Sequence, residues 1–238
     1  MASSIERIFS EVPATYELVN HILTLGMDIR WRRKAAETAA AGAEPGEWVD
    51  MCTGTGEMAV YLKRLVPEGT RVMGVDMSRA MLAEARGKPE AKGIDLVRAA
   101  ITDLPFPDES IDLITMSFAT RNVNLNREAL VRAFAELHRV LRPGGLFVNL
   151  ETSQPPSAFI RKCFHLFVSL LVRPVGSLIS GSSVAYAYLS RTIPRFYGPE
   201  DLAGIMREAG FGEVCFRRLF LGAAAVHQAR KAGPDPRV

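Results

Sequence analysis

Short apolar runs alternate with amphipathic stretches along most of this chain. Apolar runs bounded by Gly, Pro or Asp are typical of strands buried on both faces, and apolar positions that recur every three or four residues predict helices. By this pattern we predict seven strands, at residues 47–50, 71–76, 94–99, 111–118, 146–150, 213–221 and 223–229. Strands that alternate with helices at short spacing form a mostly parallel sheet with helices on both faces, so the predicted fold class is α/β.

The helices between these strands are predicted from their end signals. One helix covers Glu57 to Leu65. Ser78 and Asn126 can each cap a further helix through a side-chain oxygen, and proline at the first turn suits a last helix that begins at Gly198-Pro199. We expect Pro143-Gly144-Gly145 to end the helix that Asn126 begins.

The N-terminal residues depart from the alternation of strands and helices. Residues 1–46 are predicted to be a helical extension, because apolar residues recur at helical spacing from Tyr16 to Met27. Arg30 to Lys34 is a basic segment. It suits either a solvated face or a contact with anionic lipid.

A second departure covers residues 152–198. Phe159 to Val172 is strongly apolar, and Arg173-Pro174 is expected to end this helix. A core helix is the more common explanation of such a segment. The alternative is a lid over a lipidic substrate, or a face that lies on a membrane.

Composition and charge exclude several classes of protein. Hydrophobic residues make up 48% of the 238 positions, which suits one domain with its own core. The net charge of +3 and the scattered basic residues argue against nucleic-acid binding. Three widely spaced cysteines and four histidines without ligand spacing predict neither disulfides nor a metal site. We find no signal pattern and no apolar run long enough to span a bilayer, so a cytoplasmic location is expected.

A strand, a glycine loop and a helix meet between Asp50 and Glu57. Gly54 and Gly56 allow a sharp turn and a close approach of a ligand to the main chain. Asp76 ends the second strand, and a carboxylate there can accept hydrogen bonds from two ribose hydroxyls. The loop therefore predicts an adenosine-containing ligand, although a ligand-free turn is an alternative and the motif also fits nicotinamide cofactors. Asp50 favours S-adenosylmethionine, because its carboxylate would repel a pyrophosphate and attract an ammonium group.

Several further segments resemble one family. They are Tyr16 to Asn20 with Gly26 and Trp31, the loop from Asp50 to Glu57, Leu104 to Asp108, Ser117 to Val123, Leu141 to Gly145, Tyr186 to Ile193, and Ala209 to Phe211. With these segments the chain resembles the ubiquinone/menaquinone biosynthesis C-methyltransferases from about Tyr16 to Arg230. The glycine loop and the Arg-Pro-Gly-Gly segment are common to most class I methyltransferases, whereas Arg121-Asn122-Val123 and the Tyr16–Trp31 segment are much more specific.

The resemblance implies a Rossmann-like class I methyltransferase of one domain that uses S-adenosylmethionine. The expected parts are the extension 1–46, a donor-binding core 47–151, a helical lid and acceptor region 152–198, a closing helix and strands 199–230, and a frayed tail 231–238. The candidate donor-binding residues are Asp50, Thr53, Gly54, Thr55, Gly56, Asp76, Met77, Ala100, Ile101 and Ser117. Ala100 departs from the Asn or Asp common in the family at this point, which leaves backbone contacts unless Asp103 substitutes.

The implied reaction is methylation of a ring carbon of a reduced polyprenyl quinone. Arg121 is the candidate that stabilises the developing phenolate, with Asn122 as a supporting hydrogen-bonding residue. A bound water or a carboxylate would take the hydroxyl proton. Tyr16 and Tyr188 are candidate walls of the substrate pocket.

Other functions stay open at this point. The chain could methylate another lipid or aromatic molecule, it could bind the methyl donor without turnover in a biosynthetic complex, or, more distantly, it could be a nicotinamide oxidoreductase. Contact with the inner face of the membrane and a homo-oligomer are further expectations.

Overall fold

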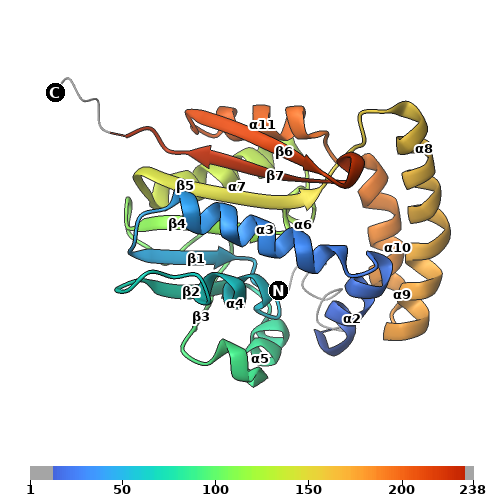
Figure 1. The fold of residues 1–238 in the computed structure, drawn as a ribbon, viewed down its shortest axis with the longest axis horizontal. Coiled ribbons are helices and arrows are strands. Elements are labelled where there is room, and N and C mark those ends of the chain that lie inside the picture. The colour runs from blue at the N-terminus through green and yellow to red at the C-terminus, as the bar shows by residue number, and fades with distance from the viewer. Residues whose placement is uncertain (1–12, 234–238) are drawn as a thin grey trace.

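The structure is a computed structural model that describes residues 13–233. Its centre is a seven-stranded sheet in the order β3-β2-β1-β4-β5-β7-β6 (Figure 1). The strands are β1 (Glu47–Met51), β2 (Arg71–Asp76), β3 (Asp95–Arg98), β4 (Ile111–Ser117), β5 (Leu141–Thr152), β6 (Glu213–Leu219) and β7 (Ala224–Arg230). Among the described residues, β7 is the one strand that runs opposite to the other six. The predicted α/β class with a mostly parallel sheet is confirmed.

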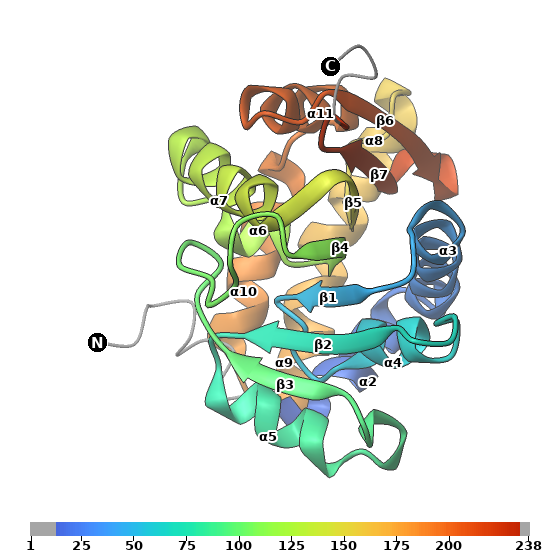
Figure 2. The ribbon, with the colours of Figure 1, turned by 90° about the vertical axis from the view of Figure 1, so that its left-hand side faces the viewer.

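Helices cover both faces of the sheet, as predicted (Figure 2). On one face lie α3 (Met27–Gly42) and α4 (Glu57–Lys63), and on the other lie α7 (Arg127–Val140) and α11 (Pro199–Glu208). Successive residues of β5 serve the two layers in turn, because side chains alternate along a strand. Val148 packs with α3 and α4, and Phe147 packs with α7 and α11.

The two predicted helix caps are present. The Oγ of Ser78 accepts a hydrogen bond from the amide of Met81 at 3.3 Å, at the start of α5 (Arg79–Gly87). The Oδ1 of Asn126 accepts one from the amide of Ala129 at 2.8 Å, at the start of α7. Each cap satisfies an amide that the first helical turn leaves without a partner.

The Pro-Gly-Gly segment does not separate α7 from the next strand. α7 ends at Val140 and β5 begins at once with Leu141, which pairs with Ile111. The register then shifts before Leu146 pairs with Leu113, so residues 142–145 form an irregularity inside the strand. Such a bulge tolerates a proline because the ladder is already interrupted there.

A helical cap covers the carboxyl ends of the parallel strands (Figure 1). It consists of α2 (Pro13–Leu23), α8 (Ala158–Phe167), the π-helical turn η2 (Val168–Val172), α9 (Arg173–Ser180), α10 (Ser183–Thr192) and the short turn η3 (Ile193–Arg195). The predicted helical extension and helical insertion therefore meet in one layer. α2 packs against α9, although about 150 residues separate them in the chain.

The insertion contains one long helix from Ala158 to Ser180, so the prediction that Arg173-Pro174 ends it is wrong. The π-helical turn changes the hydrogen-bond spacing just ahead of Pro174, which has no N–H to donate, and the helix continues. No residue of α8 is buried, and η2 buries only Val168 and Val172, so most of this segment does not lie in the core.

By length and composition, the 23-residue helix Ala158–Ser180 could cross a membrane, with a mean hydropathy of 1.6 in its most apolar window. This corrects the expectation that no apolar segment reaches that length. The helix gains its length because α8, η2 and α9 are continuous, whereas the sequence pattern placed an end at the proline.

The C-terminal tail was expected to fray from Lys231. Instead the Nζ of Lys231 donates to the carbonyl of Leu141 at 2.9 Å, and its backbone amide donates to Gly145 at 3.1 Å. Residues 1–12 and 234–238 lie outside the described residues.

Gly176 sets how closely α9 approaches α10. A Cβ at Gly176 would lie 2.1 Å from the Cδ1 of Tyr186, whose side chain is 1% exposed and has no room to turn away. We therefore expect Gly176→Ala to destabilise the protein by about 1–3 kcal/mol in chemical unfolding, through overpacking.

Gly204→Ala in α11 is the matched control, because a Cβ there meets no atom within 4 Å. This helical substitution should be neutral or slightly stabilising. Equal unfolding free energies for the two variants would show that the α9–α10 contact is not tight.

Candidate active site

The loop between β1 and α4 is built around two glycines in left-handed backbone conformations. Gly54 has φ of 56° and Gly56 has φ of 83°, which L side chains adopt only with strain. The carboxylate of Asp76 holds the loop in place, because it accepts hydrogen bonds from the amides of Gly54 at 2.9 Å and Ser78 at 2.8 Å. A Cβ at Gly54 would meet no protein atom within 4 Å. The loop therefore presents bare main chain to an open space.

That open space is a cavity of about 440 Å³, which we call the donor pocket. Eight of the ten predicted donor-binding residues line it: Thr53, Gly54, Thr55, Asp76, Met77, Ala100, Ile101 and Ser117. Asp103 does not line it, and Thr102 supplies a hydroxyl near Ala100 that sequence reasoning missed. Asn122 also lines this pocket rather than the substrate side, and its buried Oδ1 has no hydrogen-bond partner among the described residues.

Asp50 and Gly56 lie behind the pocket wall. Asp50 is 1% exposed and accepts hydrogen bonds from the hydroxyls of Thr53 at 2.6 Å and Thr115 at 2.8 Å. Burial raises the pKa of Asp50 to about 7, although these hydrogen bonds and the charge of Arg32 act in the opposite direction. Asp50 therefore does not line the pocket as predicted, and it contacts the pocket wall through the hydroxyl of Thr53.

A second cavity of about 420 Å³, the acceptor pocket, lies between the cap and the sheet edge. Its walls are mostly apolar and come from α2, α3, α8, η2, α10 and the turn η4 (Phe220–Gly222). The charged side chains that line it are Asp28, Arg32 and Arg121. Its mouth is formed by lining residues that are themselves exposed: Leu25, Phe167, Phe220 and Leu221.

The two pockets share a wall. Arg32 and Phe118 line both of them. Phe118 follows β4 and Cys52 follows β1, and both have φ of 54°, a strained conformation for residues other than glycine. Between β1 and β4 the order in which successive strands are added to the sheet changes direction. Ligands of open α/β sheets bind at this point, at the carboxyl ends of the strands.

Arg121 lies in the short helix α6 (Thr120–Val123), which follows β4, and lines the acceptor pocket. Its Nη1 donates to the carboxylate of Glu151 at 3.0 Å and to the hydroxyl of Thr152 at 2.9 Å. The side chain is 6% exposed, and its Nε has no partner among the described residues. Arg121 is therefore both a partner in a buried ion pair and a wall of the pocket with one N–H to spare.

Of the two predicted pocket tyrosines, Tyr188 is not among the residues that line the acceptor pocket. Tyr188 is half-buried on α10, and burial raises its pKa, with Arg121 lowering it and Glu151 raising it. It thus faces this ion pair, while its neighbour Leu189 lines the pocket. The side chain of Tyr16 lies outside the described residues.

A charged cluster that the sequence did not predict lies beside the shared wall. The Nη1 of Arg32 is 2.6 Å from the carboxylate of Asp28 and 3.2 Å from that of Glu57. The guanidinium also lies 5.0 Å from the ring centroid of Phe118. Arg32 is 4% exposed, so the solvated or lipid-facing interpretation is wrong for this residue, while Arg30 and Lys34 are exposed.

His21 completes this cluster and gives it the appearance of a metal site. One ligand atom from each of His21, Asp28 and Glu57 lies within 4.8 Å of the others. However, the guanidinium of Arg32 already bridges the two carboxylates and supplies the positive charge there. A metal ion would have to displace this arginine.

The donor pocket fits S-adenosylmethionine. The open space over Gly54 admits a ligand close to the main chain, the carboxylate of Asp76 lines the pocket and could accept from ribose hydroxyls, and the unpartnered Oδ1 of Asn122 can accept from an ammonium group. The fold also matches a SAM-dependent methyltransferase of Thermotoga maritima, with a TM-score of 0.62, 22% identity and coverage of 95% of this chain and 99% of that one. An O-methyltransferase family protein of Burkholderia thailandensis matches with a TM-score of 0.66, 12% identity and coverage of 93% and 60%.

Fold and site together define a class I S-adenosylmethionine-dependent methyltransferase. A model of the ubiE/COQ5 methyltransferase family matches residues 2–231, and the chain belongs to this family. It is 40% identical over 222 residues to the demethylmenaquinone methyltransferase of Thermus thermophilus. This alignment covers 92% of this chain and 98% of the relative. It is 35% identical over 224 residues to the ubiquinone/menaquinone biosynthesis C-methyltransferase UbiE of Desulfotalea psychrophila. This alignment covers 94% of this chain and 88% of that protein.

Gly54 offers a direct test of the donor pocket. We expect Gly54→Val to abolish binding of S-adenosylhomocysteine in calorimetric titration, because the side chain would fill the space over the loop. The positive φ will also cost about 1–2 kcal/mol of stability.

Gly69→Val separates these two effects. Gly69 also has a positive φ, of 81°, and nothing lies within 4 Å of its added Cβ, but it does not line the donor pocket. It should lose stability and keep donor binding. Normal binding by a folded Gly54→Val protein would place the ligand elsewhere.

Proposed function

We propose that this protein transfers a methyl group from S-adenosylmethionine to a ring carbon of a reduced polyprenyl quinone. The observation that carries this proposal is an apolar acceptor pocket with the spare N–H of Arg121 in its wall and the donor pocket behind a shared wall. The names of the relatives, demethylmenaquinone methyltransferase and UbiE, point to the same substrate class.

The chain's own residues supply charge stabilisation and positioning. S-adenosylmethionine, when bound, supplies an already activated methyl group. Arg121 donates to a ring oxygen, and this hydrogen bond strengthens as the oxygen becomes a phenolate, so it favours the transition state over the bound substrate. Glu151 and Thr152 fix the guanidinium so that its free N–H points in one direction. Apolar walls exclude water, which strengthens this interaction.

The size of the pocket suits the ring of a quinol and only part of its tail. A cavity of about 420 Å³ is within the range that holds one drug-sized molecule. A long polyprenyl tail would leave through the mouth, where Leu25, Phe220 and Leu221 are exposed. The tail can therefore stay in a lipid phase while the ring is methylated.

Other acceptors are compatible with the same pocket. A different phenolic lipid or aromatic molecule would also meet Arg121 and the apolar walls. A protein that binds the donor without turnover would keep the donor pocket and lose only the reaction. Identification of the methylated product separates these alternatives.

Replacement of Arg121 tests the proposed chemistry. In single-turnover methylation of a reduced demethylated quinol, Arg121→Ala should be slower by about 10²–10³-fold. Affinity for S-adenosylhomocysteine should stay within about twofold, because Arg121 does not line the donor pocket. Arg121→Lys should recover only part of the rate, since an ammonium group cannot reproduce the planar guanidinium.

The lysine variant also distinguishes a loss of chemistry from a loss of stability. Loss of Arg121 leaves Glu151 buried without its charge partner, which alone can destabilise a protein by about 3–5 kcal/mol, whereas lysine keeps a positive charge there. Arg127→Ala is the control, because its ion pair with Glu208 is exposed. Full activity of a folded Arg121→Ala protein would restrict Arg121 to a structural role.

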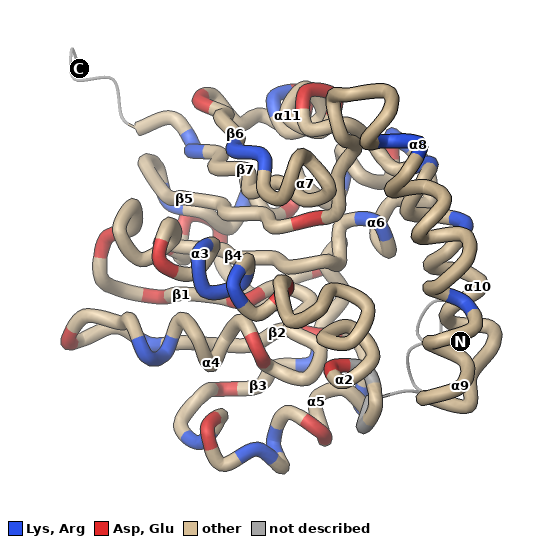
Figure 3. The backbone as a smooth tube through the Cα atoms, turned by 45° about the vertical axis from the view of Figure 1, so that its right-hand side comes forward, with Lys and Arg blue, Asp and Glu red and all other residues tan. Residues whose placement is uncertain are grey.

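We further propose that the cap is the surface by which this cytoplasmic enzyme docks on the inner face of a membrane rich in anionic lipids. Large apolar side chains of α8, η2, α9 and α10 are exposed: Phe159, Leu166, Phe167, Leu170, Leu171, Leu178 and Val184. Residues 152–198 contain five Lys and Arg residues and no Asp or Glu. Along these helices the charged positions are accordingly all basic (Figure 3). An apolar face with basic residues at its edge fits an anionic bilayer.

The mouth of the acceptor pocket belongs to the same surface. Leu25, Phe220 and Leu221 are exposed, and their φ values of 53°, 42° and 56° are left-handed. Such strain costs about 1–3 kcal/mol per residue and persists at ligand-binding positions. A membrane at this mouth would deliver the lipid substrate directly to the pocket.

Vesicle flotation tests the docking proposal. We expect the protein to float with vesicles that contain phosphatidylglycerol and much less with pure phosphatidylcholine. The double variant Phe159→Glu/Leu178→Glu should lose flotation at an unchanged melting temperature, because these side chains are 76% and 87% exposed.

Leu65→Glu, which alters an exposed leucine just after α4 and outside the cap, should float like the wild type. If the wild-type protein does not float with the anionic vesicles, the docking proposal is contradicted. If it instead elutes as a dimer that the double variant disrupts, the cap is an interface between two copies of the chain.

A further inference from the structure

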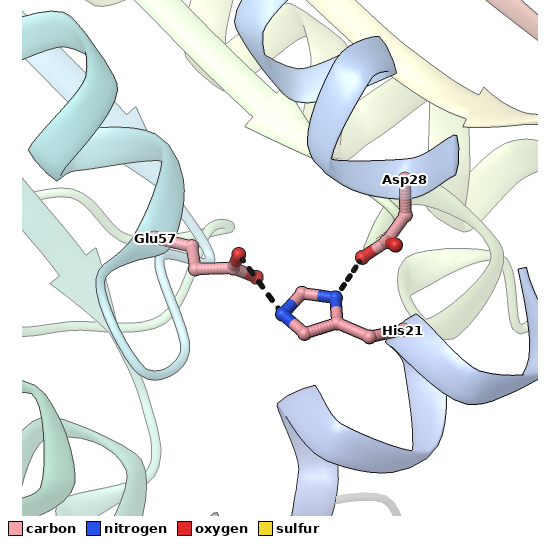
Figure 4. Close-up of side chains that lie close together, drawn as sticks. All are labelled: His21, Asp28 and Glu57. Atoms are coloured by element: carbon pink, nitrogen blue, oxygen red, sulfur yellow. Dashed lines mark hydrogen bonds and ion pairs between the residues drawn. The ribbon is translucent and has the colours of Figure 1, made fainter. Parts of the chain in front are cut away.

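The imidazole of His21 links the walls of the two pockets. Its Nδ1 lies 2.8 Å from the carboxylate of Asp28, and its Nε2 lies 3.7 Å from that of Glu57 (Figure 4). Asp28 lines the acceptor pocket and Glu57 lines the donor pocket. His21 itself lines neither pocket but lies between a residue that lines one and a residue that lines the other.

Asp28 fixes the orientation of this imidazole. Burial acts to raise the pKa of Asp28, but hydrogen bonds from Thr24 and Arg32 and the charges of Arg32 and His21 outweigh it and lower the pKa. The ionised carboxylate accepts the Nδ1–H, which leaves the lone pair on Nε2. The distance from Nε2 to Glu57 is too long for a hydrogen bond, so this nitrogen keeps its capacity to accept a proton.

The two neighbouring carboxylates already have partners. Both oxygens of Asp28 already accept hydrogen bonds, from Thr24 at 2.6 Å on one side and from Arg32 and His21 on the other. Glu57 is paired with Arg32 at 3.2 Å. Burial raises the pKa of Glu57, which the charge of Arg32 partly offsets.

We propose that His21 is the general base that takes the hydroxyl proton of the acceptor ring, directly or through one water. This inference rests on the proposed function. The O–H bond breaks, its electron pair stays on the ring oxygen, and the proton forms the N–H bond at Nε2.

The step balances over the whole reaction. The ring carbon gains the methyl group, and the electron pair of the former bond to the methyl group stays with the donor sulfur. That carbon then loses its hydrogen as a proton, which returns to the ring oxygen and restores the hydroxyl. His21 thus holds the one proton that methylation releases. Its side chain is 29% exposed, which gives this proton a route to solvent.

The first test is chemical rescue. In single-turnover methylation of a reduced quinol, His21→Ala should be slower by about 10²–10⁴-fold. Added imidazole should restore part of the rate, and more basic substituted imidazoles should restore more. His138→Ala is the control, because His138 lies on α7 and packs against Phe211 instead of lying between Asp28 and Glu57, and it should change neither the rate nor the response to imidazole.

A second readout needs no turnover. A nitronaphthol absorbs differently as neutral phenol and as phenolate, and we would bind it in the presence of S-adenosylhomocysteine. Wild-type protein should hold it as phenolate. His21→Gln, which can still donate to Asp28 but is no base, should bind it with a smaller ionised fraction.

The outcomes separate the two proposals. If the wild type methylates the quinol and His21→Ala is as fast, His21 is not the base. His21 is also not the base if imidazole does not restore the slow rate of His21→Ala and the probe bound to His21→Gln is as ionised as in the wild type. If the wild type methylates no quinol, the proposed function fails, whereas the ionisation state of the probe still tests His21.

Discussion

The buried guanidinium of Arg32 is the contact on which the arrangement of this site depends. It joins Asp28 of the helical extension to Glu57 at the start of α4, and it lies against Phe118 at the end of β4. One side chain thus connects the part of the chain that completes the acceptor pocket with the loop that forms the donor pocket. A buried charge without its partners costs about 3–5 kcal/mol, so the extension and the core are held together by a contact that tolerates little change.

The rest of the site follows from two different kinds of surface. The sheet edge offers main-chain amides, the carboxylate of Asp76 and a strained strand end, which are rigid and polar. The cap offers long apolar helices of which α8 has no buried residue. A polar donor and a greasy acceptor can therefore reach the shared wall from opposite sides. The large apolar side chains exposed on the cap are the basis of the proposed docking on lipid.

The sequence predicted the core of this protein well, because its signals are local. Apolar runs marked the strands, the two glycines marked the donor loop, and Ser78 and Asn126 marked helix starts. The failures have physical causes as well. A π-helical turn let the helix pass Pro174, and a bulge placed Pro143 inside β5. The cluster of His21, Asp28, Arg32 and Glu57 was missed because it forms only when α2, α3 and α4 pack together, and no spacing along the chain announces it.

The most direct test of the account is the position of the transferred methyl group. Purified protein would be incubated with S-adenosylmethionine that carries a carbon-13 methyl group and with a reduced demethylated quinol in anionic vesicles, and the product would be analysed by NMR. The account predicts a labelled methyl group on a ring carbon of the quinol. A label on a ring oxygen, on another lipid, or on no product at all would contradict it.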